Sequence, residues 1–581
     1  MKKPQRINLV AFGLVLLFVF VYTFDRCSAV ARPEETAKAV AAVQRIEVLP
    51  TEADAVAWAF TALLQYPEAD RPYIAFVWLP PYADPEWIGA VDFAMNAAIS
   101  QTRILHRADR HAGGWLLAYN LKRFAPGPEI EQLLATWDGI AADESRFHVP
   151  SVNVQEVVET VNVEQRDPRT NKIVATPQQQ TRNVTTKIAI LAPHLQESLA
   201  KHATDAEKSE RVDVLLAQMT ASAGRIYPAD WLLEQLLTSV RGKYPEFRQM
   251  PGFDGAASDS FSQFQTLLSK RGFFFEQSRD LSGDKGALLL ISGVTGKSRV
   301  IQTTYGLASR QPMAVTFDYK DSRIRPDQQF VRNLITFDAL ADAKEAFLPM
   351  PNGLVEYVLA DASGKIQRAA PPDIVADSTK PDGHTKELEM GMSCVLCHAP
   401  ENGYKTARND MEFLLGSDID FIGDAVSYEN KDRQTVTISR EQATAIVVGR
   451  YGERIDEPDG VLGRARRDLI KTVDALTDYK PTADGPTSVA LVGAKIKEIY
   501  HRYRYQTIDA ERAALELGVR VPAGQGLAVF RALVPAPAVG ESEDIILGLL
   551  RNGATIKRDD WSAVYVEAAR RAVVNRSKLK S

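Results

Sequence analysis

The spacing of hydrophobic residues changes repeatedly between helical and strand-like periods in the first third of the chain. The predicted elements are helices over residues 51–64, 85–100 and 128–142 and strands over residues 71–79 and 114–123. Two polar strand-like runs flank residues 167–172 and predict a hairpin whose second strand ends at 188–191. This alternation of helices and strands predicts an α+β domain.

The pattern becomes less regular further along and ends in helices. A charged helix is expected near residues 205–220, and strand-like runs at 286–292 and 313–319 precede a turn at Asp361–Gly364. Helical periods dominate the C-terminal end and are interrupted at Pro535–Pro537. The predicted fold class is therefore a multidomain α+β protein. Its segments are an α+β domain over residues 32–205, a mixed α/β domain over 206–380, a mainly loop and helical segment over 381–478 and a helical region over 479–581.

The N-terminus has the pattern of an export signal. Three basic residues within the first six positions precede an uncharged, mostly apolar run from Leu9 to Phe24. Ala29–Ala31 offers the small-x-small pattern that signal peptidase accepts, so we expect residues 1–31 to be removed after Ala31. The alternative is an uncleaved inner-membrane anchor formed by residues 7–24. The sequence thus predicts a periplasmic protein that touches a membrane only through this segment.

Composition places the remaining chain among ordinary globular proteins. Of 581 residues, 45% are hydrophobic and 25% are charged, which excludes a disordered, collagenous or coiled-coil protein. The net charge is -5, and removal of residues 1–31 leaves 65 basic and 73 acidic residues, a charge of -8. Because no long basic run is present, nucleic acid is not an expected partner. The three cysteines are too few for a disulfide scaffold, and Cys27 is expected to be a passenger of the signal.

One motif carries specific chemistry. Cys394-Val395-Leu396-Cys397-His398 is the C-x-x-C-H sequence of c-type haem attachment. Two thiols three residues apart project from one helical turn, and each can form a thioether with a haem vinyl group. The adjoining imidazole of His398 is then placed to bind the iron as proximal ligand. The sequence predicts one covalent haem c and a haem-binding domain over residues 381–478.

Other interpretations of the two cysteines are weaker. A zinc site would need a second ligand pair, and the chain contains no second C-x-x-C. A thioredoxin-like redox pair would follow a strand, whereas these cysteines follow Pro371, Pro372 and the loop Lys380–Gly383. A simple disulfide remains the plainest alternative.

The second axial ligand of the iron is left open by the sequence. A small mitochondrial-type cytochrome places a methionine several tens of residues downstream, but the last methionine here is Met411, only 13 residues after His398. Met411 is the first candidate, with Met390, Met392, His384 and His501 as others. An open or water-filled position is a further alternative, and Met411 also fits a core role on a short helix.

One short segment resembles part of a phosphate-binding loop. Gly293–Ser298 resembles the end of a G-x-x-x-x-G-K-S loop, but Ile291 occupies the position of the first glycine. The following residues are strand-like rather than helical, so nucleotide binding is not expected.

Several segments beside the motif resemble a family of large exported single-haem proteins that is abundant in planctomycetes and related bacteria. The segments that carry the resemblance are Leu348–Tyr357, Asp373–Asp377, Gly391–Ser393, Ala229–Trp231, Phe317–Tyr319 and Ala513–Gly518. The resemblance implies one covalent haem held by a large architecture of its own, and it offers no established reaction. The resemblance does not assign a ligand role to Met411.

Three functions are compatible with an exported single haem. Electron transfer comes first, because a fixed haem exchanges one electron without a substrate pocket. A haem enzyme or small-ligand sensor with an open distal iron is the alternative, and an envelope binding or scaffold protein that carries a haem is the second alternative. Both alternatives are retained because electron transfer alone does not explain a chain of this size. The negative mature charge favours a basic redox partner protein.

Overall fold

The computed structural model describes most of the chain between residues 47 and 576. The described residues are 47–50, 52–125, 127–142, 152–163, 180–191, 226–251, 260–270, 285–289, 299–305, 312–318, 334–335, 341–370, 375–405, 410–411, 422–429, 433–451, 455–522, 524–537, 544–576 and 579. Four predicted features lie outside these ranges. They are the export signal with Cys27, the helix near 205–220, the turn at 167–172 and the segment 293–298 that resembles a phosphate-binding loop.

The chain forms two compact units. The larger spans Pro50–Gln506, and the smaller combines the segment ending at Leu49 with the residues from Thr507 onward. The boundaries predicted after residues 205, 380 and 478 all fall inside the larger unit. Helices and several sheets occur together, so the predicted multidomain α+β class is confirmed.

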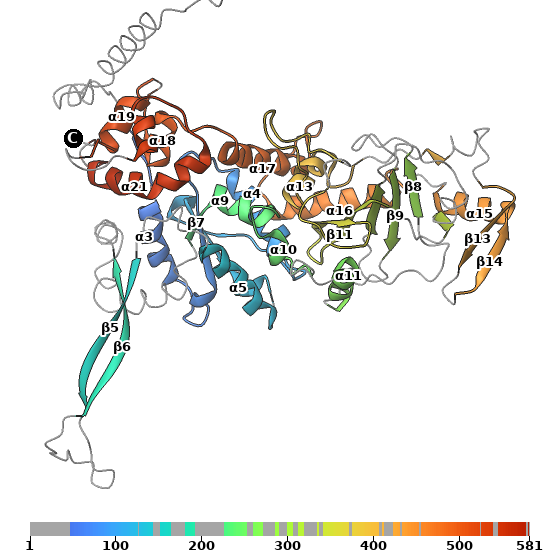
Figure 1. The fold of residues 1–581 in the computed structure, drawn as a ribbon, viewed down its shortest axis with the longest axis horizontal. Coiled ribbons are helices and arrows are strands. Elements are labelled where there is room, and N and C mark those ends of the chain that lie inside the picture. Colours follow the sequence, from blue (N-terminus) through green and yellow to red (C-terminus); the bar gives the residue numbers. More distant parts are fainter. Residues whose placement is uncertain are drawn as a thin grey trace, which may run out of the picture. The chain divides into compact units, whose positions relative to one another are not determined.

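The first part of the larger unit is a four-stranded sheet with helices against it (Figure 1). The strands are β3 (Asp109–His111), β4 (Leu116–Asn120), β2 (Ile74–Trp78) and β7 (Ile226–Pro228), in that order across the sheet. The helices are α3 (Glu52–Leu63), α4 (Trp87–Ile99), α5 (Glu129–Ala142), α9 (Ala229–Leu237) and α10 (Tyr244–Phe247). Parallel pairing of β2 with β7 joins residues on both sides of the boundary predicted at 205. The antiparallel pair β5 (Val152–Val163) and β6 (Gln180–Leu191) matches the predicted hairpin.

The second sheet is an antiparallel meander of five strands. Its order is β8 (Lys285–Leu289), β9 (Arg299–Tyr305), β10 (Pro312–Asp318), β11 (Ala343–Pro349) and β12 (Val355–Asp361). The predicted strand after Ser298 is β9, and the predicted turn at Asp361–Gly364 is present, closed by the amide of Gly364, which donates to the Asp361 carbonyl at 3.0 Å. Helix α11 (Ser260–Lys270), the strands β13 (Ala425–Glu429) and β14 (Thr435–Ser439) and helix α15 (Arg440–Tyr451) complete this region.

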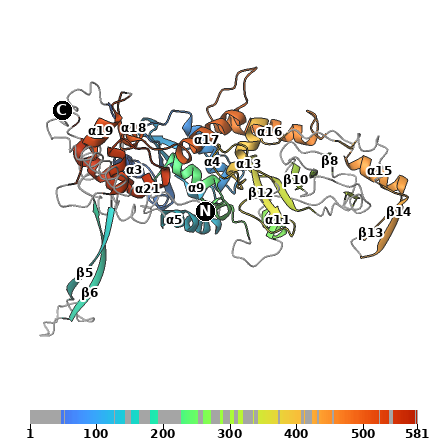
Figure 2. The same cartoon turned by 45° about the horizontal axis from the view of Figure 1, so that its top comes forward.

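The cysteine motif lies on α13 (Met392–His398), with α16 (Val461–Leu476) and α17 (Ser488–Arg504) close to it (Figures 1 and 2). Helix α17 belongs to the region predicted as a separate helical C-terminal segment, yet it contacts α13 and the turn that follows it. A Cβ atom on Gly493 of α17 would lie 2.3 Å from the Cβ of Ala399. This close approach fixes the position of the residue directly after His398.

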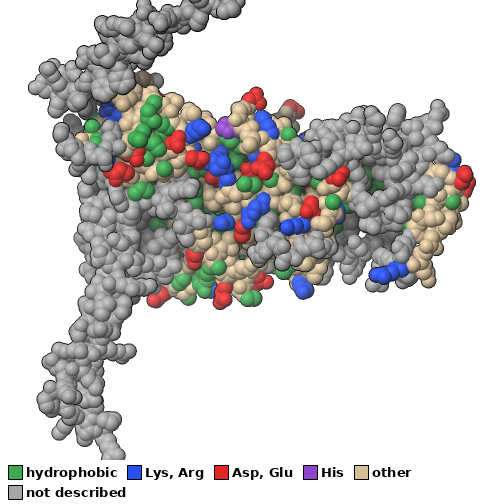
Figure 3. All heavy atoms as spheres, in the orientation of Figure 1, with side chains coloured by type: hydrophobic (Ala, Val, Ile, Leu, Met, Phe, Trp, Pro, Cys, Tyr) green, Lys and Arg blue, Asp and Glu red, His purple; other side chains and the backbone are tan. Residues whose placement is uncertain are grey.

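The smaller unit is mainly helical, as predicted. It contains α18 (Ala510–Glu516), α19 (Gly526–Leu533), α20 (Ile545–Arg551) and α21 (Arg558–Arg576). A short strand pair, β1 (Glu47–Val48) with β15 (Val519–Arg520), ties the segment before Pro50 to these helices. On the face drawn in Figure 3, acidic and basic side chains are interspersed over the described residues, which fits the nearly balanced composition.

Candidate haem site

One face of the five-stranded sheet supplies the wall of the site. Because side chains alternate between the faces of a strand, Glu345 and Phe347 on β11 share a face. The strand register places Leu359 and Tyr357 of β12 directly beside them. On the other side, β9 and β10 pair Arg299 with Asp318. Charged residues thus lie at one end of this face and aromatic residues at the other.

Helix α13 begins at a position that requires glycine. Gly391 has φ 87°, a left-handed value that glycine adopts without steric cost. A Cβ atom there would lie 2.3 Å from the carbonyl oxygen of Leu237. The side-chain oxygen of Ser393 accepts a hydrogen bond from the Glu389 amide at 3.0 Å, which closes the first turn. The start of the motif helix is therefore fixed against α9 and the preceding loop.

The chain leaves α13 through a turn that holds His398. Asn402 and Gly403 both have left-handed φ, 59° and 85°, and the Gly403 amide donates to the His398 carbonyl at 2.9 Å. The Tyr357 hydroxyl donates to the Gly403 carbonyl at 3.3 Å. Arg466 of α16 donates to the Tyr404 carbonyl at 2.8 Å. The turn's own hydrogen bond and contacts from β12 and α16 thus fix the backbone that carries the imidazole.

The His398 ring is held between aromatic side chains of the sheet. It stacks on Tyr357 with ring centroids 5.5 Å apart and meets Phe347 edge-on at 4.8 Å. Its Nε2 atom lies 3.3 Å from Glu345 Oε1. Its Nδ1 atom is buried and has no hydrogen-bond partner among the described residues. The ring is therefore fixed in orientation, with Nε2 directed at the charged end of the wall.

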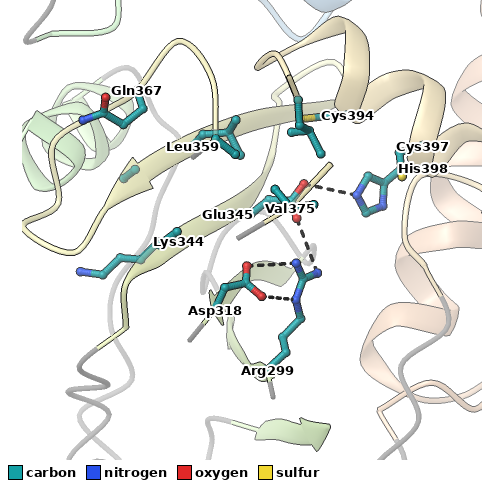
Figure 4. A pocket seen from close by; sticks show the side chains of 14 residues that line it. Arg299, Asp318, Lys344, Glu345, Leu359, Gln367, Val375, Cys394, Cys397 and His398 are labelled. Carbon is teal, nitrogen blue, oxygen red and sulfur yellow. Dashed lines mark hydrogen bonds and ion pairs between the residues drawn. The ribbon is translucent and has the colours of Figure 1, made fainter. Parts of the chain in front are cut away.

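Three charged side chains form a buried cluster opposite His398 (Figure 4). Arg299 donates to both Asp318 oxygens, at 2.6 and 3.0 Å, and its Nη1 lies 3.6 Å from Glu345 Oε2. Burial opposes ionisation of Glu345, but the contact with His398 and the charge of Arg299 lower its pKa. For Asp318, burial raises the pKa despite the contact with Arg299.

Both thiols have raised pKa values, although Cys394 is buried and Cys397 is only half-buried. Burial raises the pKa of Cys394 well above its ordinary value, and the negative charge of Glu345 adds to this. Burial also raises the pKa of Cys397, although Lys405 partly offsets the effect. Reactive redox cysteines have lowered pKa values, so this environment does not suit a thioredoxin-like pair.

Both thiols and the imidazole open into one pocket (Figure 4). Leu359, Val375 and Leu388 form part of its apolar wall, and Arg299 brings positive charge to it. The donor set suits a haem, because two thiols, an imidazole nitrogen and an apolar wall are all present.

The other predicted iron ligands do not line this pocket in the described part of the chain. Met411 is fully buried, as are Met390 and Met392. The sulfur of Met390 accepts a hydrogen bond from the Leu359 amide at 3.4 Å. His384 and His501 both pack on the ring of Tyr505, at 4.5 and 5.2 Å between ring centroids. The role of Met411 as distal ligand stays a prediction.

Sequence reasoning missed the charged cluster. Arg299 directly follows the segment that resembles a phosphate-binding loop, and Asp318 lies in the strand predicted over 313–319. No sequence pattern places either residue beside the haem motif. Glu345 gave no signal, because no element was predicted over residues 343–349 and a single acidic residue there looks like an ordinary solvent-facing position. The meander register is what brings Glu345 opposite His398.

Comparison with protein-family models, with curated proteins and with solved structures found no match to this chain. Among the helices that the structure describes, none is long and apolar enough to cross a membrane. Within the same ranges, no group of three or more His, Cys, Asp or Glu residues is arranged to hold a metal ion.

Proposed function

We propose that this protein is an exported monohaem c-type cytochrome that transfers one electron in the periplasm. The observation that carries the proposal is the convergence of Cys394, Cys397 and His398 on one pocket. The resemblance of the segments around the motif points the same way. A bound haem supplies one-electron redox chemistry at its iron.

Different residues of the pocket would hold different parts of the haem. Cys394 and Cys397 provide the thioether sulfurs, and His398 provides the proximal nitrogen. Tyr357 and Phe347 keep the imidazole in place through their ring contacts. The apolar wall excludes water from the remaining surface of the ring.

The proposed compartment and partner follow from the predicted signal and the charge. Haem is attached to such motifs outside the cytoplasm, where an export signal would deliver the chain. A mature charge of -8 attracts a basic redox partner and raises its association rate.

The direct experiment removes both thiols. The double variant Cys394→Ala and Cys397→Ala, expressed with the haem-maturation machinery, should show no haem stain on a denaturing gel, whereas wild type should stain. The matched control is Cys27→Ala, which lies in the predicted signal and should stain like wild type. A stained band from the double variant would refute covalent attachment at this motif.

One observation favours a second candidate function, a haem enzyme or small-ligand sensor. The wall opposite His398 carries Glu345, Arg299 and Asp318 rather than a sulfur ligand. Polar groups facing a haem are typical of sites that bind or activate small molecules. Carbon monoxide binding by the reduced protein separates the candidates, because a carrier with two strong axial ligands binds it poorly.

A further inference from the structure

We propose that the turn formed by residues 102–107 and four arginines around it form a docking surface for an acidic partner protein. The inference goes beyond the proposed haem function and does not depend on it. It gives the four-stranded sheet of the larger unit a partner of its own, whose charge is opposite to that of the basic redox partner expected from the overall charge.

The surface beside strand β3 carries an excess of positive charge, although the chain as a whole is acidic. Arg107 and Arg110 both donate to the exposed carboxylate of Asp478, each at 2.5 Å. Arg107 also lies 3.9 Å from Asp92, which is buried beneath it. Both arginines remain 40% or more exposed, so a partner can still reach their guanidinium groups.

Two further arginines of this surface are exposed. Arg103 lies in the turn itself, and neither it nor Arg123 pairs with a carboxylate in the part of the chain that the structure describes. Burial lowers the pKa of His106 in the turn, and the charge of Arg123 acts in the same direction, which places this cation close by. The nearby Asp109 already accepts a hydrogen bond from the Tyr66 hydroxyl at 2.8 Å. The cations thus outnumber the exposed carboxylates.

The turn is held in one shape by helix α4. The side chain of Asn96 donates to the His106 carbonyl at 2.7 Å and accepts a hydrogen bond from the His106 amide at 2.9 Å. Within the turn, the hydroxyl oxygen of Thr102 accepts a hydrogen bond from the Ile104 amide at 3.4 Å. A surface that is already ordered loses little conformational entropy when a partner binds.

The side chain of Ile104 is 64% exposed in the middle of these cations. Single exposed apolar residues are common on protein surfaces, but an apolar centre with a polar rim rich in arginine is the composition of protein interfaces. Guanidinium groups bind carboxylates through paired hydrogen bonds, so the matching surface is acidic with an apolar spot. A membrane surface suits the turn less well, because interfacial binding needs a larger apolar face.

Two acidic probes test the surface on the exported chain without residues 1–31. One is a random copolymer of glutamate and leucine, which presents carboxylates beside apolar groups. The other is a vesicle of equal parts phosphatidylglycerol and phosphatidylcholine. We expect the chain to bind the immobilised copolymer and not the vesicles. Because its net charge is -8, binding to an acidic polymer requires a local positive surface.

Matched variants locate the binding. Joint replacement Arg103→Glu and Arg123→Glu should weaken copolymer binding by about tenfold or more. Ile104→Ser should weaken it about threefold and leave the copolymer no better than pure polyglutamate. Arg467→Glu reverses an exposed arginine of α16, and Val448→Ser removes an apolar side chain of α15 that is 41% exposed. Both controls should bind like wild type.

Three results would overturn the inference. One is failure of the wild-type chain to bind the copolymer, and another is equal copolymer binding by the double arginine variant. The third is vesicle binding that the double arginine variant loses, which would assign the surface to a membrane. Loss of covalent haem would defeat the proposed function and leave these binding results unchanged, so the two failures are distinguishable.

Discussion

Glu345 and Glu516 are two buried carboxylates with opposite surroundings. Glu516 in the smaller unit accepts hydrogen bonds from both terminal nitrogens of Arg558, at 2.8 and 2.7 Å, and from Trp561 at 2.8 Å. Arg512 approaches it at 3.1 Å. Glu345 instead shares Arg299 with Asp318 and turns its other oxygen to His398.

The difference separates a structural cluster from a candidate functional one. Two arginines surround the carboxylate of Glu516, and the contacts described above are all made with other side chains of the protein. At Glu345 two acids share one arginine, and the cluster opens into a pocket that contains both thiols of the motif. An incompletely balanced buried group beside a cavity is the arrangement expected at a binding site.

The largest expected effect comes from breaking the closed cluster. Glu516→Gln leaves Arg558 and Arg512 without their buried counter-charge and should lower the free energy of unfolding by about 3–5 kcal/mol. Glu345→Gln should cost about 1 kcal/mol or less, because Arg299 keeps Asp318 and the amide can still contact His398. Urea unfolding of both haem-loaded variants, followed by circular dichroism, measures the contrast. Equal losses from the two substitutions would contradict it.

The closed cluster should also show in the pH dependence of stability. Burial opposes ionisation of Glu516, but the charges of Arg558 and Arg512 lower its pKa to about 2. A depressed pKa stabilises the fold above the unfolded value of about 4.3 and loses this contribution as the pH falls toward 2. The loss should approach about 3 kcal/mol. The difference between wild type and Glu516→Gln, measured by urea unfolding from pH 6 to pH 2, should shrink over this window and stay constant above it.

A glycine at the start of the motif helix tests how the open site is positioned. Gly391→Ala forces a left-handed alanine and a contact with the Leu237 carbonyl, and should destabilise the fold by about 3 kcal/mol. It should also lower the yield of covalent haem. Gly383→Ala is the control, because its φ is 84° and no described atom lies within 4 Å of the added carbon. That variant should lose only about 1 kcal/mol and attach haem normally.

The smallest effect concerns the surface. If a basic partner docks on the acidic protein, the rate of electron transfer between them should fall by about tenfold as salt rises from low to high concentration. Stopped-flow reduction by a basic cytochrome at several salt concentrations measures this. A rate that does not change with salt would exclude electrostatic steering of the partner.

Local patterns predicted much of the fold. Helices α3, α4 and α5 and strands β2, β4 and β10 lie where hydrophobic spacing predicted them. Helix α4 and strands β2 and β4 are buried along their whole length. The arrangement of these elements could not be predicted. The pairing of β2 with β7 and the packing of α17 on α13 join segments that are far apart in the sequence.

The same limit applies to the site. Cys394, Cys397 and His398 are adjacent in the sequence, so their spacing predicted a common pocket, and the structure brings them to one. Arg299, Asp318 and Glu345 come from three strands and meet only through the register of the sheet. No local sequence pattern encodes such a register, so none could predict that Glu345 would lie beside His398.

The most direct test of covalent haem attachment is the intact mass of the denatured protein after export. We expect the mass of the processed chain plus one haem for wild type, and the mass of the polypeptide alone for the variant without Cys394 and Cys397. A denatured wild-type chain with no added haem mass would contradict the central claim.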